Sequence, residues 1–127
     1  MKTESDLLKS LKGFDSKKPQ VIEHESDEFT FLGKKDSEGF PQPDFGILII
    51  EYIPNKKLIE LKALKKYKDD MREKVFSYER ITDIIYRDID EKYEPHALIV
   101  RIKTRPRGGF KSKLSEGDRK RVYEMLS

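Results

Sequence analysis

Asp44 is the first residue of this sequence whose type and position suit chemistry. It follows Pro43 in a loop rich in glycine and proline, directly before the most apolar run of the chain. A carboxyl group in such a constrained loop is partly removed from water, which raises its pKa and suits it to donate a proton. An aspartate that caps a turn explains the same position, and spacing alone favours that structural interpretation.

Glu60, Lys62 and Lys65 stand at the start of a predicted helix and form a second candidate group. Residues three apart share one helical face, so the two ammonium groups lie together, with Glu60 a turn earlier. A carboxylate and two lysines gathered there suit a ligand that carries both hydrogen-bond donors and phosphates. A solvated helix face with weak surface ion pairs is the simpler interpretation, and composition alone favours it.

Glu79 and Arg107 complete the candidates. Glu79 follows the predicted N-cap Ser77, where its carboxylate either holds the N–H groups of a guanine-like edge or simply complements the helix dipole. Arg107 lies on a glycine-flanked turn and would extend the lysine pair into a phosphate cluster. His24 and His96 are isolated and lack metal-ligand spacing, so we interpret both as surface histidines and predict no metal site.

Length and composition limit the classes of protein to consider. With 127 residues, the chain has room for one folded domain. Charged residues make up 40%, but the apolar positions cluster into periodic runs, which indicates folding rather than disorder. A net charge of +3 does not demand a nucleic-acid partner, although a local basic patch leaves that alternative open. The sequence has no membrane-spanning run, signal peptide or cysteine, so we expect a cytoplasmic protein without disulfides or a cysteine nucleophile.

The apolar periodicity predicts a single α+β domain over residues 21–127, preceded by a polar extension over residues 1–20. A helix is expected with a stripe of Leu61, Leu64, Tyr67 or Lys68, Met71 and Val75. Further helices are expected from Asp6 to Gly13, over 77–92 and over 118–126. Strands are expected at 21–22, 29–32, 47–53, 97–104 and 110–114, with a loop over 33–45. The strand over 97–104 is expected to bury one of its faces.

The order of these elements is β-β-α-α-β-β. An antiparallel four-stranded sheet with two helices on one face is the simplest way to bury the apolar stripes. The unpaired edges of such a small sheet need cover, which favours a homo-oligomer.

Four segments, taken in order, resemble a known family: QPDF at 42–45, EYIP at 51–54, ELKALKKY at 60–67 and PRGG at 106–109. They are similar to segments of QueF, the NADPH-dependent 7-cyano-7-deazaguanine reductases of queuosine biosynthesis, a tRNA modification. The resemblance covers roughly residues 28–110. It implies the tunnelling fold (T-fold), whose subunits join into a barrel with sites at the subunit interfaces.

The resemblance also implies roles for individual residues. Asp44 matches the family's catalytic aspartate, which donates a proton during nitrile reduction. Glu79 falls where the family places the glutamate that anchors the deazaguanine. Lys62, Lys65 and Arg107 match basic residues associated with the NADPH phosphates.

The sequence departs from the family at the nucleophile. The family has a cysteine seven residues before the aspartate, which is Ser37 here, whereas alignment on residues 28–30 puts the position near Gly33. Neither residue has a thiol, and a serine hydroxyl is far less nucleophilic at neutral pH. The resemblance implies that two further residues bind the substrate along with Glu79. Glu60 is the first residue of the family's signature segment. Tyr78 stands where the family has a histidine, just before the anchoring glutamate.

Three functions follow as alternatives. The first is reduction of 7-cyano-7-deazaguanine to 7-aminomethyl-7-deazaguanine with NADPH, by this chain or as a divergent homologue of that enzyme. The second is a T-fold protein that binds a purine- or pterin-like base and has lost the covalent thioimide step. The third is a non-catalytic RNA-binding module. Asp44 favours the first two, because a pure binder needs no proton donor.

Overall fold

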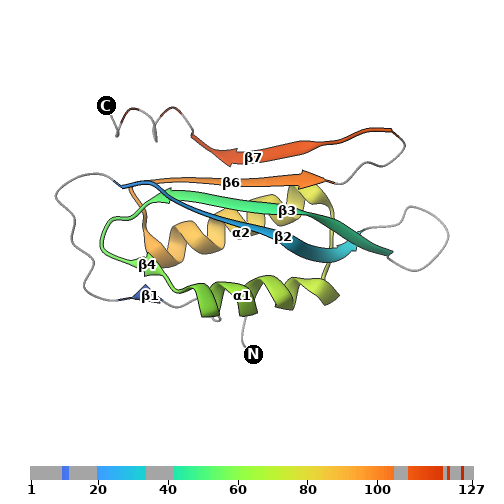
Figure 1. Cartoon of the computed structure of the whole chain (residues 1–127), viewed down its shortest axis with the longest axis horizontal. Coiled ribbons are helices and arrows are strands. Elements are labelled where there is room, and N and C mark those ends of the chain that lie inside the picture. The colour runs from blue at the N-terminus through green and yellow to red at the C-terminus, as the bar shows by residue number, and fades with distance from the viewer. Residues whose placement is uncertain are drawn as a thin grey trace.

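The computed structural model describes residues 10–11, 20–33, 42–104, 109–118, 120 and 124 (Figure 1). Its strands are β1 (Ser10–Leu11), β2 (Ile22–Gly33), β3 (Gln42–Ile53), β4 (Leu58–Ile59), β5 (Val75–Phe76), β6 (Ala97–Thr104) and β7 (Lys113–Gly117). The four longest pair antiparallel in the order β2-β3-β6-β7, which confirms the predicted four-stranded sheet. Two short additions go beyond the prediction: β5 runs parallel to the end of β2, and β1 pairs with β4 in a separate ribbon.

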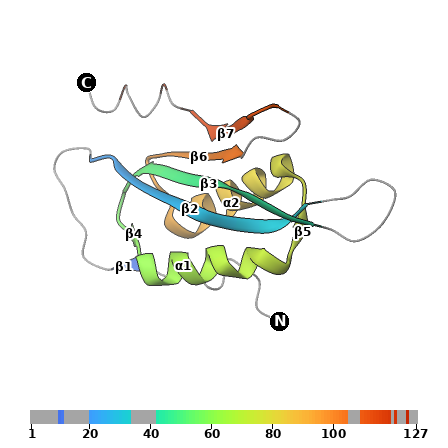
Figure 2. The ribbon, with the colours of Figure 1, turned by 45° about the vertical axis from the view of Figure 1, so that its right-hand side comes forward.

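Two helices, α1 (Leu61–Asp70) and α2 (Tyr78–Tyr93), lie on the same face of the sheet (Figures 1 and 2). The predicted start of α2 is confirmed, because Ser77 Oγ accepts a hydrogen bond from the Arg80 N–H at 3.2 Å. Within the described part of the chain, no helix is long and apolar enough to cross a lipid bilayer.

The predicted apolar stripe of α1 is wrong at its two ends. Leu61 is 60% exposed, although it was expected to be buried. At the other end the helix stops at Asp70, Met71 begins the 3₁₀ turn η2 (Met71–Glu73), and Val75 lies in β5. The chain must return to the sheet edge there, so pairing of β5 with β2 replaces a further helical turn.

Several predicted strand limits also change. β2 is one continuous strand, and β3 begins at Gln42, so the expected 33–45 loop is shorter. Leu11 pairs with Leu58 in a ribbon instead of lying in a helix, which shows that tertiary pairing overrides local helix propensity. The last strand is Lys113–Gly117 instead of 110–114, because Lys103 of β6 pairs with Lys113. In the expected terminal helix, positions 120 and 124 are helical.

The main hydrophobic core lies between the sheet and the two helices. Helix α2 contributes Ile81, Ile85 and Ile89, which are fully buried, and Ile84 packs at the margin. The prediction that 97–104 buries one face only is wrong, because Ile99 is fully buried on the opposite face with Ile53 and Ala97. On that opposite face Arg101 also lies 3.1 Å from carboxylate oxygens of both Glu23 and Glu51.

A one-residue bulge divides β2 into two halves. Ser26 pairs with Leu48 and Phe29 pairs with Gly46, so three steps along β2 match two steps along β3. Successive strand side chains alternate between faces, so the extra residue reverses which positions face the helices. Before the bulge, the even-numbered positions of β2 face α1. After it, Phe29 and Phe31 do, and both are fully buried in the core.

Tyr67 joins the two helices. Its ring is fully buried, and its hydroxyl donates a hydrogen bond of 2.6 Å to Asp88 of α2. Asp88 is half-buried at this contact. A hydrogen bond to a charged group is worth more than a neutral one, so this contact helps to fix α1 against α2.

We expect Tyr67→Phe to lower the free energy of unfolding by about 1.5–3 kcal/mol, since it removes a hydrogen bond to a carboxylate and keeps the buried ring. Urea denaturation of Tyr67→Phe, Asp88→Ala and the double variant measures the effect. The double variant should lose less stability than the sum of the single ones. Strict additivity would contradict a direct interaction between the two side chains.

Candidate functional site

One end of the sheet brings the start of β3 and the start of α2 together. Asp44 pairs through its backbone with Phe31 of β2. The Phe31 ring meets the Tyr78 ring edge-on, with centroids 4.9 Å apart. Because Tyr78 directly precedes Glu79, this aromatic contact sets Asp44 and Glu79 at the same end of the molecule. We call them the base-end group.

Glu79 is exposed in the first turn of α2. Its carboxylate lies near the positive end of the helix dipole, so stabilisation of α2 also explains a glutamate at this position. Tyr78 is half-buried and packs on the core, which accounts for an aromatic residue at this position. Ser37 and Arg107 lie outside the described residues, and Gly33, the other position considered for the nucleophile, is the last residue of β2.

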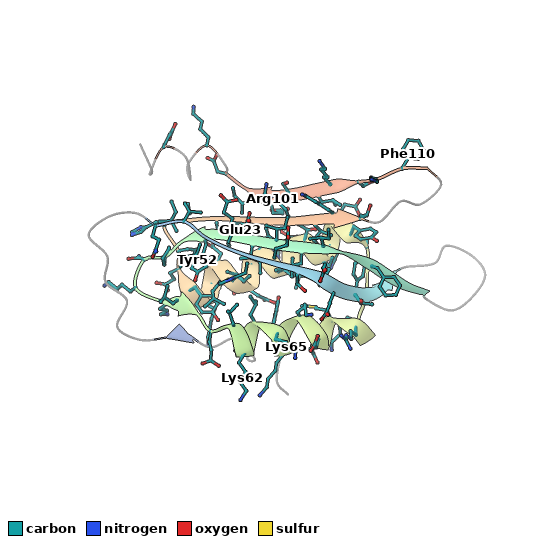
Figure 3. All side chains as sticks on the ribbon, in the orientation of Figure 1. Glu23, Tyr52, Lys62, Lys65, Arg101 and Phe110 are labelled. Atoms are coloured by element: carbon teal, nitrogen blue, oxygen red, sulfur yellow. The ribbon has the colours of Figure 1, made fainter. Side chains whose placement is uncertain are left out.

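The second set of predicted residues lies at the start of α1, and we call it the α1 group. Glu60 is the N-cap residue of α1, and its carbonyl oxygen accepts a hydrogen bond from the Leu64 N–H at 2.9 Å. Lys62 and Lys65 are exposed side chains of α1 (Figure 3). Neither lysine forms an ion pair with any other described residue, so both ammonium groups are available to an anion.

The structure keeps these two groups apart within one chain. The start of α1 is tied to Tyr52, whose hydroxyl oxygen accepts a hydrogen bond from the Ile59 N–H at 3.1 Å. Tyr52 follows Asp44 by eight residues along β3, which corresponds to about 26 Å in an extended strand. The sequence motifs alone do not show this separation, because it follows from the direction of β3 and the place where α1 docks.

A hollow of about 160 Å³ opens between α1 and the first half of β2, beside β3. Its walls are mainly apolar. His24, Glu25 and Ser26 of β2 add polar groups, and Lys65 and Lys68 of α1 complete one side. The apolar wall residues are Leu48, Ile50, Leu61 and Leu64.

His24 is half-buried in this hollow, so its predicted position on the surface is wrong. Its ring lies 6.1 Å from the Tyr52 ring, measured between centroids. Burial lowers the pKa of His24 below its ordinary value, so its imidazole is neutral at neutral pH. His96 is exposed, as predicted. The even-numbered spacing of His24 and Ser26 in β2 was a signal for a shared face, but the bulge that ends this face was not visible in the sequence.

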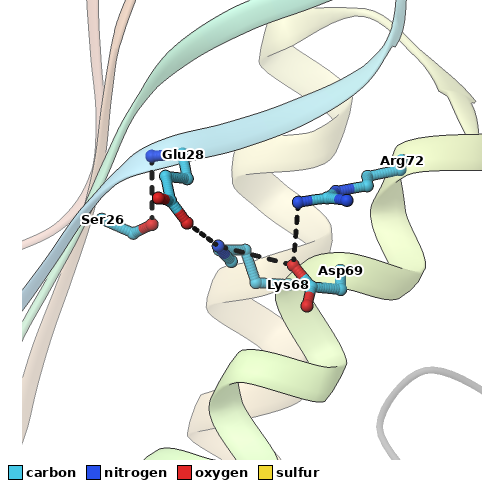
Figure 4. Close-up of polar contacts among 5 residues, drawn as sticks. All are labelled: Ser26, Glu28, Lys68, Asp69 and Arg72. Atoms are coloured by element: carbon cyan, nitrogen blue, oxygen red, sulfur yellow. Dashed lines mark hydrogen bonds and ion pairs between the residues drawn. The ribbon is translucent and has the colours of Figure 1, made fainter.

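Lys68 differs from the other lysines of α1 because it is buried and neutralised (Figure 4). Its Nζ atom lies 3.4 Å from Asp69 Oδ1 and 3.9 Å from Glu28 Oε2. Arg72 approaches the same Asp69 oxygen at 3.5 Å. Glu28 lies in the bulge of β2, and its N–H donates to Ser26 Oγ at 3.3 Å. Lys68 therefore links α1 to the bulge.

Comparison with known proteins identifies close sequence relatives. A family described as QueF-like protein matches residues 43–121. The NADPH-dependent 7-cyano-7-deazaguanine reductase of Rhodopirellula baltica is 35% identical over 94 residues, covering 74% of each chain. The reductase of the same name from Pelodictyon phaeoclathratiforme is 36% identical over 110 residues, covering 87% of this chain and 91% of the relative.

A solved structure shares the fold. It is the apo form of an archaeosine synthase called QueF-Like, which superposes with a TM-score of 0.67 at 14% sequence identity. The superposition covers 81% of this chain and 95% of that one. It supports the predicted α+β fold class, in which an antiparallel sheet carries two helices on one face.

The lowered pKa of His24 predicts a pH dependence of stability. The unfolded chain takes up a proton at His24 near pH 6.5, whereas the folded chain does so only at lower pH. Stability should therefore fall as pH decreases from about 6.5 to the folded pKa, and this part of the fall should be absent in His24→Leu. Urea denaturation at several pH values tests this. An equally steep fall in His24→Leu would show that His24 is not its cause.

Proposed function

The chain belongs to the QueF-like protein family, and from that membership we propose that it binds a 7-deazaguanine base at the base-end group and NADPH at the α1 group. The observation that carries this proposal is the pair Lys62 and Lys65, exposed on α1 without a carboxylate partner in the described part of the chain.

Glu79 is the proposed anchor for the base. A carboxylate accepts two N–H bonds at once from the edge of a guanine-like ring, which gives both affinity and orientation. Glu79 is exposed and lies at the same end as Asp44, the proposed proton donor. Tyr78, held by Phe31, sets the direction in which α2 starts and so positions the glutamate.

The α1 group fits the phosphates of NADPH. Phosphate groups require unpaired cations, and Lys62 and Lys65 provide two of them on one helical face. Arg107 is the proposed third. When bound, NADPH supplies a hydride; the role of these side chains is to hold and orient its phosphates.

The absence of cysteine separates binding from the usual covalent step. The chain contains no cysteine at all, and the family match begins at residue 43, after the position of the nucleophile. Ser37 lacks the acidity that makes a thiol reactive near neutral pH. We therefore propose that the base and the dinucleotide bind, and that reduction through a thioimide does not occur. This favours the divergent base-binding member over the full reductase.

We further propose that a complete site needs two copies of the chain. The base-end group and the start of α1 are about 26 Å apart along β3, so one chain does not bring them against one reacting base. Sites shared between subunits of a homo-oligomer would place the α1 group of one copy beside the base-end group of another. The exposed edge strand β7 offers backbone groups for such an assembly.

Calorimetric titration with 7-cyano-7-deazaguanine, followed by NADPH oxidation in the same mixture, tests the proposed function. We expect saturable binding of the base and no oxidation of NADPH above the background rate. Oxidation at a rate typical of enzymes, about 1 per second or more, would show that nitrile reduction proceeds without a thiol. Failure to bind the base would refute the assignment of the base-end group.

Two sets of variants separate the two groups. Glu79→Ala should weaken base binding by about tenfold or more, because it removes charge-assisted hydrogen bonds. Glu91→Ala, which removes an exposed glutamate from the same helix, is the matched control.

The double variant Lys62→Ala/Lys65→Ala should weaken NADPH binding by about tenfold while base binding is retained. Lys113→Ala, an exposed lysine of β7, is its control. Equal loss of NADPH affinity in Lys113→Ala would mean that net charge, and not the α1 group, determines the affinity.

A further inference from the structure

The hollow between α1 and the first half of β2 has no role in the function proposed above, apart from Lys65 at its side. We propose that it holds the adenine ring of the dinucleotide, with the adjoining phosphates on Lys65 and Lys62. This inference rests on the proposed binding of NADPH and names the part of the chain that recognises the nucleotide.

The size and walls of the hollow suit one flat ring system. An apolar cavity of about 150 Å³ holds a benzene molecule, and the hollow has about 160 Å³ and is open on one side. The open side leaves room for the second ring of a purine. Leu61 forms part of the rim, and its 60% exposure leaves an apolar side chain for a ring to cover.

Two polar groups in the hollow suit a heteroaromatic ring better than a hydrocarbon. His24 is neutral, so its imidazole offers one donor and one acceptor, and neither nitrogen has a hydrogen-bond partner among the described residues. Ser26 Oγ accepts the Glu28 N–H, which leaves its hydroxyl hydrogen to donate. An apolar pocket with a few convergent polar groups is typical of a site for a cofactor ring.

The charged side chains around the hollow are Glu25 of β2 and Lys65 and Lys68 of α1. The carboxylate of Glu25 repels a phosphate, so the phosphates lie on the α1 side. Lys68 is already neutralised by Asp69 and Glu28, so it adds no free positive charge. Lys65 also lines the hollow, yet it is exposed and unpaired within the described residues. If the ring of a nucleotide occupies the hollow, its phosphates therefore extend out of the hollow past Lys65 toward Lys62.

The two lysines favour adenine over nicotinamide. The adenosine half of NADPH carries a 2′-phosphate in addition to the diphosphate, whereas the nicotinamide half carries no phosphate beyond the diphosphate. Lys65 in the wall of the hollow and the exposed Lys62 beside it on α1 therefore suit the adenosine half better. The ring in the hollow is the one that does not react.

The test compares three probes by calorimetry: adenosine 2′,5′-bisphosphate, inorganic tripolyphosphate and nicotinamide mononucleotide. The variant His24→Leu/Leu61→Asn changes the hollow without adding charge, and Leu61→Met is its conservative control. We expect the double variant to bind adenosine bisphosphate about tenfold more weakly and tripolyphosphate unchanged. The Lys62→Ala/Lys65→Ala variant should lose affinity for both. Thermal unfolding and the retained tripolyphosphate binding confirm that the variant is folded.

The outcomes distinguish this inference from the proposed function. If NADPH binds and needs both lysines, but the hollow variant binds adenosine bisphosphate within about twofold of wild type, the hollow is not the adenine site and the cofactor assignment stands. If the hollow variant affects nicotinamide mononucleotide instead, the ring assignment is wrong. If the unaltered protein binds neither NADPH nor the bisphosphate, the cofactor proposal itself fails.

Discussion

The bulge in β2 is the local feature on which both proposed binding regions depend. Before it, His24 and Ser26 face α1 and form the polar part of the hollow. After it, Phe31 faces the core and fixes Tyr78 at the start of α2. Lys68 holds the bulge to α1 through Glu28, so one extra residue separates the half of β2 that lines the hollow from the half that supports the start of α2.

The central strand β3 imposes the second constraint, which is distance. Asp44 stands near its beginning, whereas Tyr52 near its end holds the start of α1. A packed sheet does not shorten, so flexing one chain does not bring the proposed proton donor to the start of α1. The proposed assembly, in which neighbouring copies offer opposite ends of their sheets, would resolve this. It would give a homo-oligomer a chemical role beyond covering sheet edges.

The sequence predicted the fold class and the start of α2 because both follow from local signals: strong periodicity and the N-cap Ser77. It placed Lys62 and Lys65 correctly on an exposed helix face for the same reason. It misjudged His24, Leu61 and Ile99, because their burial or exposure depends on what packs against each position. The bulge and the distance between the two groups are also tertiary properties, so residue spacing in the chain could not predict them.

The most direct test of this account is complementation between two binding-defective variants. The Glu79→Ala chain and the Lys62→Ala/Lys65→Ala chain are co-expressed with different tags and purified as a mixed oligomer, and the change in NADPH fluorescence on adding 7-cyano-7-deazaguanine is measured. At ligand concentrations that just saturate the wild type, each variant alone should show a much smaller change. The mixed oligomer should recover part of the wild-type response, because one interface then has both groups intact. Two results would contradict a site shared between two copies. One is a full change in NADPH fluorescence from a monomeric wild-type protein. The other is no change from the mixed oligomer when the wild-type oligomer does respond.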